Sequence, residues 1–327
     1  MSNLTRRNAL ALLGGVATFG LAACGGSQQP AANEGEKTYK IGVLQLVEHE
    51  ALDAANEGFV EALDESGIAY EIDQQNAQGD QSACQTIAAK LVGDGDDLIL
   101  AIATPAVEAC AGATSDIPIV GTAVTDFAAS DLVASNDAPG GNITGSSDLT
   151  PVADQIKMLH TILPDAKEVG VLWCTAESNS DLQAQMAIDA CKEYGINATN
   201  YTVSSSNEIQ SVVESMAGKV DVIYTPTDNT IAAGMSTVTM VADDNKIPVI
   251  AGEEGEFNAG ALCTYTISYK ELGKLAGQMA VRILVDGEDP ASMPIEYYPS
   301  DKLTLLYDEK KAEALGIDPS VWETLGA

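Results

Sequence analysis

Short apolar runs alternate with longer amphipathic stretches over most of the chain, beginning at Lys40. The runs are almost wholly apolar, which is typical of parallel strands buried on both faces. The stretches between them repeat apolar positions every three or four residues, as a helix with one buried face does. The predicted strands are 41–46, 98–103, 119–124, 169–173, 220–224 and 249–251. The predicted helices are 52–63, 82–92, 106–113, 153–162, 182–194, 209–216, 230–243 and 271–285. Repeated strand–helix units predict an α/β fold with parallel sheets covered on both faces.

One polar, turn-rich segment, 125–141, interrupts this rhythm. It is long enough for a connection to need its own explanation. A strand resumes at 142–147, and a second series of helices and strands begins at Pro151. We interpret this region as the crossing between two doubly wound parallel-sheet lobes. A strand-like segment at 261–268 indicates that the chain crosses more than once. The expected N-terminal lobe is 38–145 plus 265–292, and the expected C-terminal lobe is 146–264 plus 293–327.

The first 23 residues have the pattern of an export signal peptide. Arg6 and Arg7 precede an uncharged, mostly apolar run over 9–23, which is shorter than the roughly 20 residues that a membrane-spanning helix needs. The small residues before Cys24 resemble the lipobox of bacterial lipoproteins, in which that cysteine is lipidated. An ordinary secretory signal is the alternative, and the Sec and twin-arginine export routes both stay open. Residues 24–37 are expected to form a flexible tether.

Composition and charge narrow the function classes. Apolar residues make up 46% and charged residues 20% of the chain, as in a packed globular protein. Without Arg6 and Arg7, 14 basic residues face 48 acidic ones, a formal charge of −34. Such a surface repels nucleic acid and anionic lipid. About 300 residues remain after the signal, which is typical of two domains.

Five cysteines follow the lipobox cysteine, and an odd number leaves at least one unpaired. Cys84 and Cys110 fall on consecutive predicted helices, so a disulfide between them is one interpretation. Free, half-buried thiols are the other.

Polar residues directly follow the predicted strands, where parallel sheets of this kind bind their ligands. Helix N-termini at these positions suit a carboxylate, which favours Thr104 and Thr122 as ligands of an amino acid carboxylate. Asp228, with Glu253 as second choice, suits its ammonium group. Local N-capping is the alternative for each of them. The full expected binding set is Gln45, Glu48, Thr104, Thr122, Asp126, Ser178, Asn179, Thr227, Asp228, Asn229 and Glu253.

The sequence lacks the motifs that would indicate an enzyme. His49 and His160 are the only histidines, and no nucleophile-elbow, P-loop or dinucleotide-binding pattern occurs in a suitable place. His49 lies between Glu48 and Glu50, which invites a metal site. Three consecutive side chains cannot all turn to one ion without an irregular backbone, so we expect no metal and no cofactor.

Seven segments in order resemble the ABC-transporter substrate-binding proteins of the tryptophan/tyrosine type. They include GVLQLVEHEALDAANEGF at 42–59, LILAIATPA at 98–106, NITGSSDLTP at 142–151 and VIYTPTDNTIA at 222–232. The resemblance covers residues 39–316. It implies the type I periplasmic-binding-protein fold, in which two hinged lobes close around a small ligand.

The resemblance also implies a function. A monomeric, lipid-anchored, extracytoplasmic protein would capture an amino acid, preferably an aromatic one, and deliver it to an ABC permease and its ATPase. A sensor of the same fold that docks to a membrane signalling receptor is the alternative, as is a different small polar metabolite. On this reading Asp228→Ala weakens amino acid binding by at least about 2 kcal/mol. The melting temperature of the empty protein should change little.

Overall fold

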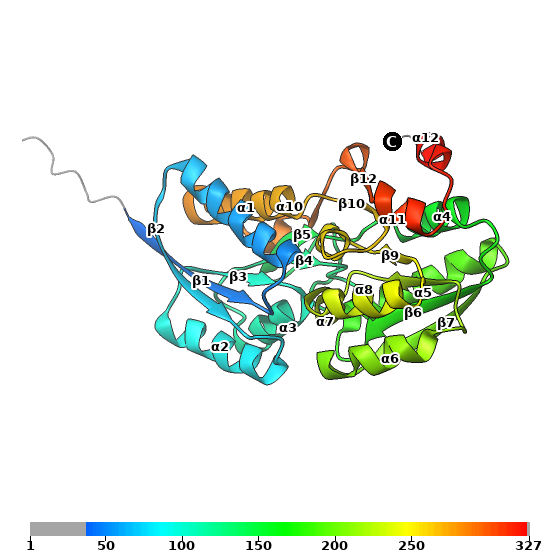
Figure 1. The fold of residues 1–327 in the computed structure, drawn as a ribbon. Coiled ribbons are helices and arrows are strands. Elements are labelled where there is room, and N and C mark those ends of the chain that lie inside the picture. Colours follow the sequence, from blue (N-terminus) through cyan, green and yellow to red (C-terminus); the bar gives the residue numbers. More distant parts are fainter. Residues whose placement is uncertain (1–36, 326–327) are drawn as a thin grey trace, which may run out of the picture. The chain divides into compact units, whose positions relative to one another are not determined.

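The computed structural model describes residues 37–325, which contain two six-stranded sheets (Figure 1). The expected signal peptide, Cys24 and the tether as far as residue 36 lie outside the described residues. Among the helices that are described, none combines the length and the apolar character needed to span a bilayer.

The first sheet has the strand order β11-β5-β4-β3-β1-β2, and its neighbouring strands are parallel. Its strands are β1 (Thr38–Gln45), β2 (Ala69–Asn76), β3 (Leu98–Ile102), β4 (Ile119–Val124), β5 (Ile143–Ser147) and β11 (Glu296–Tyr297). Helices α1 and α10 lie on one face, and α2 and α3 on the other (Figure 1). These helices are α1 (Glu50–Ser66), α2 (Gln81–Asp94), α3 (Thr104–Ala113) and α10 (Tyr269–Val281).

The second sheet repeats this arrangement in the order β12-β10-β9-β8-β6-β7, with β12 antiparallel to β10. Its strands are β6 (Glu168–Cys174), β7 (Asn197–Val203), β8 (Val222–Thr225), β9 (Val249–Ala251), β10 (Cys263–Thr266) and β12 (Thr304–Tyr307). The helices of this lobe are α4 (Val152–Ile162), α5 (Ser178–Glu193), α6 (Ile209–Met216), α7 (Asn229–Ala233), α8 (Met235–Asp244), α9 (Glu254–Asn258), α11 (Glu309–Ala314) and α12 (Ser320–Leu325). Two apolar clusters fill this lobe and a third fills the first lobe. The prediction of two doubly wound α/β lobes is confirmed.

The chain changes sheets at places that differ from those expected. Segment 125–141 joins β4 to β5, which are neighbours in the first sheet, so it stays within that lobe. The chain leaves the first sheet only after β5, returns between β10 and α10, and leaves again between β11 and β12. Strands β5 and β10 therefore run past the expected boundaries at 145 and 264, and β11 of the first sheet lies beyond the expected boundary at 292.

Two further differences concern single elements. Strands β2 and β7 carry no apolar run because each lies at the edge of its sheet, where side chains are half exposed. The helix expected at 230–243 is divided by Gly234 into α7 and α8. Glycine is a poor helix former, and a Cβ at this position would lie 2.3 Å from Ile209 Cδ1.

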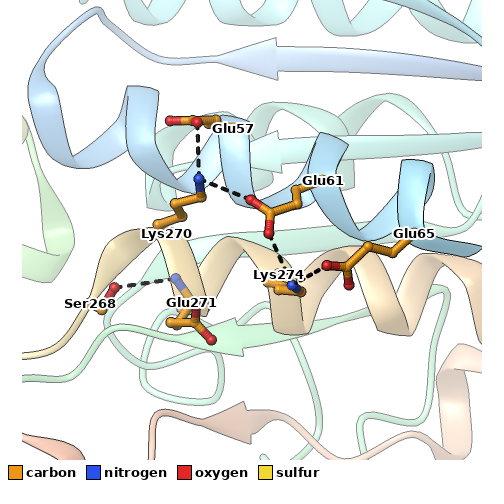
Figure 2. Close-up of polar contacts among 7 residues, drawn as sticks. All are labelled: Glu57, Glu61, Glu65, Ser268, Lys270, Glu271 and Lys274. Carbon is orange, nitrogen blue, oxygen red and sulfur yellow. Dashed lines mark hydrogen bonds and ion pairs between the residues drawn. The ribbon is translucent and has the colours of Figure 1, made fainter.

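A seam of glycines lets α1 and α10 pack closely. A Cβ on Gly58 would lie 1.9 Å from the carbonyl oxygen of Lys270, and one on Gly273 would lie 1.8 Å from that of Ala55. Two lysines of α10 flank this seam and pair with three glutamates of α1 (Figure 2). These ion pairs are open to solvent, so they add little to the stability of the fold. The close backbone contact, not the ion pairs, fixes α10 against the first lobe.

The five described cysteines are buried free thiols. Cys84 and Cys110 therefore form no disulfide with each other, and the second interpretation, that of free thiols, holds for both. Burial raises the pKa of Cys84 to about 11 and that of Cys110 to about 12. Both are therefore protonated and unreactive at neutral pH.

Candidate functional site

The carboxyl ends of the two sheets face each other, and hydrogen bonds join the lobes there. Gln183 Nε2 donates to Thr125 Oγ1 at 3.0 Å, and Ser178 Oγ donates to Glu108 Oε1 at 2.8 Å. Two further bonds, Gln81 Nε2 to Ala176 O and Asn258 Nδ2 to Glu50 Oε1, cross between the lobes at 2.5 and 2.6 Å. The structure is therefore a closed form, because such bonds require both lobes to be in contact.

A cavity of about 160 Å³ lies at this junction. Its apolar walls come from both lobes, namely Leu46, Val47 and Pro105 from the first and Ala176 and Ala233 from the second. Polar residues of both lobes complete the lining, namely Gln78, Gln81, Glu177, Ser204, Ser205, Ser206, Asn229 and Thr230. The cavity is therefore a mixed polar and apolar site of a kind that can bind a small molecule.

Thr104 is the first residue of α3 and directly precedes Pro105, which lines this cavity. The preceding residue, Ala103, has a φ of 85°, which is strained for a residue with a side chain. The Thr104 hydroxyl is buried, and within residues 37–325 it has no hydrogen-bond partner. Thr104 thus offers a hydroxyl donor at a helix N-terminus, which is what a carboxylate ligand needs.

Asn179 and Thr227 form a buried polar cluster of the second lobe. Asn179 Nδ2 donates to Thr227 O at 3.2 Å, and Thr227 Oγ1 lies 3.4 Å from Thr150 Oγ1. Gln183, one helical turn beyond Asn179, also donates to Thr227 O, at 3.4 Å. The structure therefore brings these two expected residues together with Gln183, which was not expected.

Asp228 and Glu253 are helix caps. Asp228 accepts hydrogen bonds from the backbone N–H groups of Ile231 and Cys174, at 2.8 and 2.6 Å. Glu253 accepts from those of Gly255 and Glu256, both at 2.6 Å. Burial raises the pKa of each carboxyl to about 8. The N-capping alternative therefore describes their positions, since all four carboxyl oxygens already have backbone partners.

Two other expected residues support the scaffold of the first lobe. Thr122 Oγ1 lies 2.9 Å from Ser146 Oγ, which donates to the carbonyl oxygen of Leu272 in α10. Gln45 donates to Val47 O and to Asp53 Oδ1, where α1 begins. These contacts place Thr122 and Gln45 in the lobe interior and at a helix start.

Asp126 organises the irregular segment 125–141. Its Oδ1 accepts from the backbone N–H groups of Ala128 and Ala129 and from Asn136 Nδ2, each at 3.0 Å. Glu48 has an exposed side chain, and Ser178 is exposed beside Glu108. None of these three is among the buried polar residues of the junction.

Glu177, a residue that the sequence did not single out, holds the start of α7. Its carboxylate accepts from Asn229 Nδ2 at 2.6 Å and from both the N–H and the hydroxyl of Thr230 at 2.8 Å. Asn229 Oδ1 in turn lies 3.2 Å from His49 Nε2 of the first lobe. Burial lowers the pKa of His49, so the neutral imidazole donates to Asn229. His49 thus joins the lobes. His49 lies in the polar segment after β1, which the sequence marked as a candidate binding region. Glu177 is one of several polar residues after β6, and nothing in the sequence distinguishes it from them.

Asp148 was also missed, although it directly follows a predicted strand. The expected binding set does not include it. Asp148 Oδ2 accepts from the hydroxyl of Tyr269, the first residue of α10, at 2.9 Å. Asp148 thus links two of the segments that connect the lobes.

Lowering the pH from about 8.5 to about 5.5 is expected to raise the melting temperature by several degrees. In the folded chain burial raises the pKa of Asp228 and Glu253 to about 8 and that of Asp148 to about 6. Unfolded carboxyls titrate near pH 4, so between these values the folded chain binds more protons. The free energy of unfolding therefore rises as the pH falls. Burial lowers the pKa of His49, which reduces the free energy of unfolding below about pH 6.5. This opposing effect comes from one group, whereas three carboxyls act in the other direction.

Glu253→Gln provides the informative variant for this pH effect, because it fixes an uncharged side chain at the same position. Its melting temperature should depend less on pH than that of the wild type. Glu71→Gln, on the exposed side of β2, is the matched control and should leave the dependence unchanged. Equal wild-type stability at both pH values would show that the buried carboxyls are not neutral.

Comparisons with known proteins agree on one family. The family model described as ABC transporter substrate binding protein matches residues 40–320. The tyrosine-binding protein of Clostridioides difficile is 40% identical over 291 residues, covering 86% of this chain and 84% of that protein. A Streptococcus pneumoniae ABC domain in complex with L-Trp is 36% identical, with a TM-score of 0.84, over 88% of this chain and 98% of that one.

A third relative was solved in an open form. The ligand-free, open structure of a substrate binding protein with adhesive properties from Clostridium difficile is 42% identical. It covers 86% of this chain and 95% of that one, with a TM-score of only 0.65. The L-Trp complex fits better despite its lower identity. The lobes are therefore arranged here as in the ligand-bound relative, which agrees with the hydrogen bonds that join them.

Proposed function

Because this chain belongs to the family of ABC transporter substrate-binding proteins, we propose that it captures an aromatic amino acid between its lobes. The family consists of binding proteins and not enzymes. Tyrosine and tryptophan are the preferred ligands, since a tyrosine-binding protein and an L-Trp complex are among the relatives. Closure would then present the loaded protein to an ABC permease and its ATPase.

One observation carries this proposal, namely the buried polar atoms, without partners within residues 37–325, that both lobes present where α3 contacts α5. Thr104 supplies a hydroxyl from the first lobe, and Asn179 and Gln183 supply carboxamide oxygens from the second. Within the described part of the chain none of these three atoms has a partner. Buried polar groups are normally satisfied, so such atoms indicate groups that bind a ligand. The apolar walls suit a side chain and the polar atoms suit the two charged groups of an amino acid.

The carboxylate is assigned to Thr104 and the N-terminus of α3. Thr122, the other residue expected for this role, is bonded to Ser146 within the first lobe. A micromolar affinity corresponds to about 8 kcal/mol. Burying an aromatic side chain contributes several kcal/mol of binding free energy, at about 25 cal/mol per Å². Charge-assisted hydrogen bonds contribute further binding free energy.

Outside the described residues, the proposal includes a lipid anchor on Cys24. A lipidated cysteine at the mature N-terminus would hold the protein at the outer face of the cell membrane. Substrate-binding proteins of this family work outside the cytoplasm, so an anchor would keep the protein near its permease. Mass spectrometry of the mature N-terminus tests this, and an unmodified Cys24 would overturn it.

A thermal-shift screen tests the ligand class. L-Tyrosine, L-tryptophan and L-phenylalanine are expected to raise the melting temperature, with L-alanine and glucose as controls. A ligand at about 100 times its Kd stabilises the folded state by about 2.7 kcal/mol. A shift with glucose alone would reject the amino acid, and no shift with the three aromatic amino acids would reject the aromatic preference.

A further inference from the structure

Four buried carboxyl side chains lie close to the segments that connect the lobes, and they differ in what their oxygens contact. Asp228 and Glu253 use both oxygens to cap helices. Glu256 accepts from Thr225 Oγ1 at 2.6 Å and from Gly252 N at 3.1 Å through one oxygen. Asp148 uses Oδ2 for Tyr269, while Oδ1 is buried and has no partner within residues 37–325. Only Asp148 and Glu256 therefore have a free oxygen within this group.

Asp148 and Glu256 differ in their charge at neutral pH. Burial raises the pKa of Glu256 well above its usual range, reinforced by the nearby Glu253, so Glu256 is neutral. Burial raises the pKa of Asp148 only to about 6, because the hydrogen bond from Tyr269 favours its charged form. At neutral pH Asp148 is thus mostly a carboxylate. A buried carboxylate is costly unless a cation pairs with it.

Asp148 lies next to the residues that join the lobes. Its backbone N–H donates to Val124 O at 3.0 Å, and Ser147 Oγ donates to Thr125 O at 2.7 Å. Thr125 Oγ1 accepts from Gln183 Nε2 of the second lobe at 3.0 Å. A chain of direct contacts therefore leads from Asp148 through Thr125 to α5.

The orientations of Asn179 and Gln183 follow from one carbonyl group. Both side chains direct their NH₂ groups to Thr227 O, which can only accept. Their carboxamide oxygens, Asn179 Oδ1 and Gln183 Oε1, are consequently the free ends. Residues four apart on a helix lie on the same face, and both NH₂ groups contact the same carbonyl oxygen, so the two carboxamide groups are neighbours. Like Asp148 Oδ1, they can only accept hydrogen bonds.

From these contacts we infer that Asp148 Oδ1, together with the carboxamide oxygens of Asn179 and Gln183, holds the α-ammonium group of the amino acid ligand. This inference rests on the proposed function and names a part of its site. An ammonium group has three N–H donors and one positive charge, which match three acceptors of which one is charged. Asp228 and Glu253 are replaced in this role because their oxygens are engaged by backbone N–H groups.

The placement also explains how binding would favour closure. Asp148 lies in the connection between β5 and α4, whereas Asn179 and Gln183 belong to α5 of the second lobe. One ammonium group would contact all three only when α5 approaches Thr125. A ligand shifts an open–closed equilibrium by such differential contacts.

The test compares Asp148→Asn with the wild type for two ligands by calorimetry. The first is L-tyrosine or L-tryptophan, whichever the wild type binds more tightly, and the second is its des-amino analogue, 3-(4-hydroxyphenyl)propionate or 3-indolepropionate. The variant should bind the amino acid at least about 100-fold more weakly, as expected for losing a buried charge pair. It should bind the des-amino analogue with unchanged affinity. Asp154→Asn, an exposed change on α4, is the matched control and should alter neither affinity.

Each outcome has one meaning. Wild-type protein that binds neither amino acid would defeat the proposed function itself. A wild type that binds, with an Asp148→Asn variant of nearly equal affinity, would overturn the ammonium assignment alone. If the variant does not fold, a crystal structure of the wild-type complex decides. An ammonium nitrogen within hydrogen-bond distance of Asp148 Oδ1 supports the assignment, and one bound elsewhere overturns it.

Discussion

Gly273→Ala is expected to lower the free energy of unfolding by about 3 kcal/mol or more. The added Cβ would lie 1.8 Å from the carbonyl oxygen of Ala55, which is backbone and cannot rotate away. Helices α1 and α10 would have to separate, and the apolar contacts between them would weaken. Urea unfolding followed by circular dichroism measures the change.

Gly112→Ala is the matched control for this substitution. Gly112 also lies within a helix, α3, but an added Cβ meets no atom within 4 Å. Alanine forms helices better than glycine, so this variant should be up to about 1 kcal/mol more stable than the wild type. Equal stability of the two variants would refute the close packing of α1 against α10.

Asp228→Ala is expected to destabilise the empty protein by about 2–4 kcal/mol. The change leaves the buried N–H groups of Ile231 and Cys174 without acceptors, and each such group costs about 1–3 kcal/mol. This replaces the sequence-based expectation of an almost unchanged melting temperature. That expectation took Asp228 for a ligand group alone, whereas the carboxyl joins the start of α7 to the end of β6.

Asp80→Ala separates the effect of burial from that of capping. Asp80 caps α2 through the N–H groups of Ser82 and Ala83, at 2.7 and 3.0 Å, but its side chain is exposed. Water can replace an exposed cap, so the loss should be about 1 kcal/mol. Equal losses for Asp80→Ala and Asp228→Ala in urea titrations would mean that Asp228 is not a buried bridge.

The sequence predicted the interior of the fold well because interior strands have a simple signal. Strands β1, β3, β4 and β6 are apolar runs, and their burial on both faces explains that composition. Edge strands β2 and β7 have no such run, so periodicity could not find them. The lobe crossings depend on which strands pair, and strand pairing is not written in any local pattern.

The candidate site was predicted in part. Thr104 and Asn179 each have a buried polar atom without a partner in the described residues, and both stand at helix starts beyond strand ends, in helices that contact each other. Asp228 and Glu253 have the same sequence context as ligand residues, and only their hydrogen bonds identify them as caps. Asp148 and Gln183 owe their positions to the packing of α5 against the connection after β5. No spacing along the chain reveals that contact.

The account depends on two lobes that close around an aromatic amino acid. Small-angle X-ray scattering of the mature protein with and without L-tyrosine or L-tryptophan tests this most directly, with L-alanine as the control. At saturating concentration the aromatic amino acid should reduce the radius of gyration, and L-alanine should not. An unchanged radius of gyration with both L-tyrosine and L-tryptophan would contradict the account.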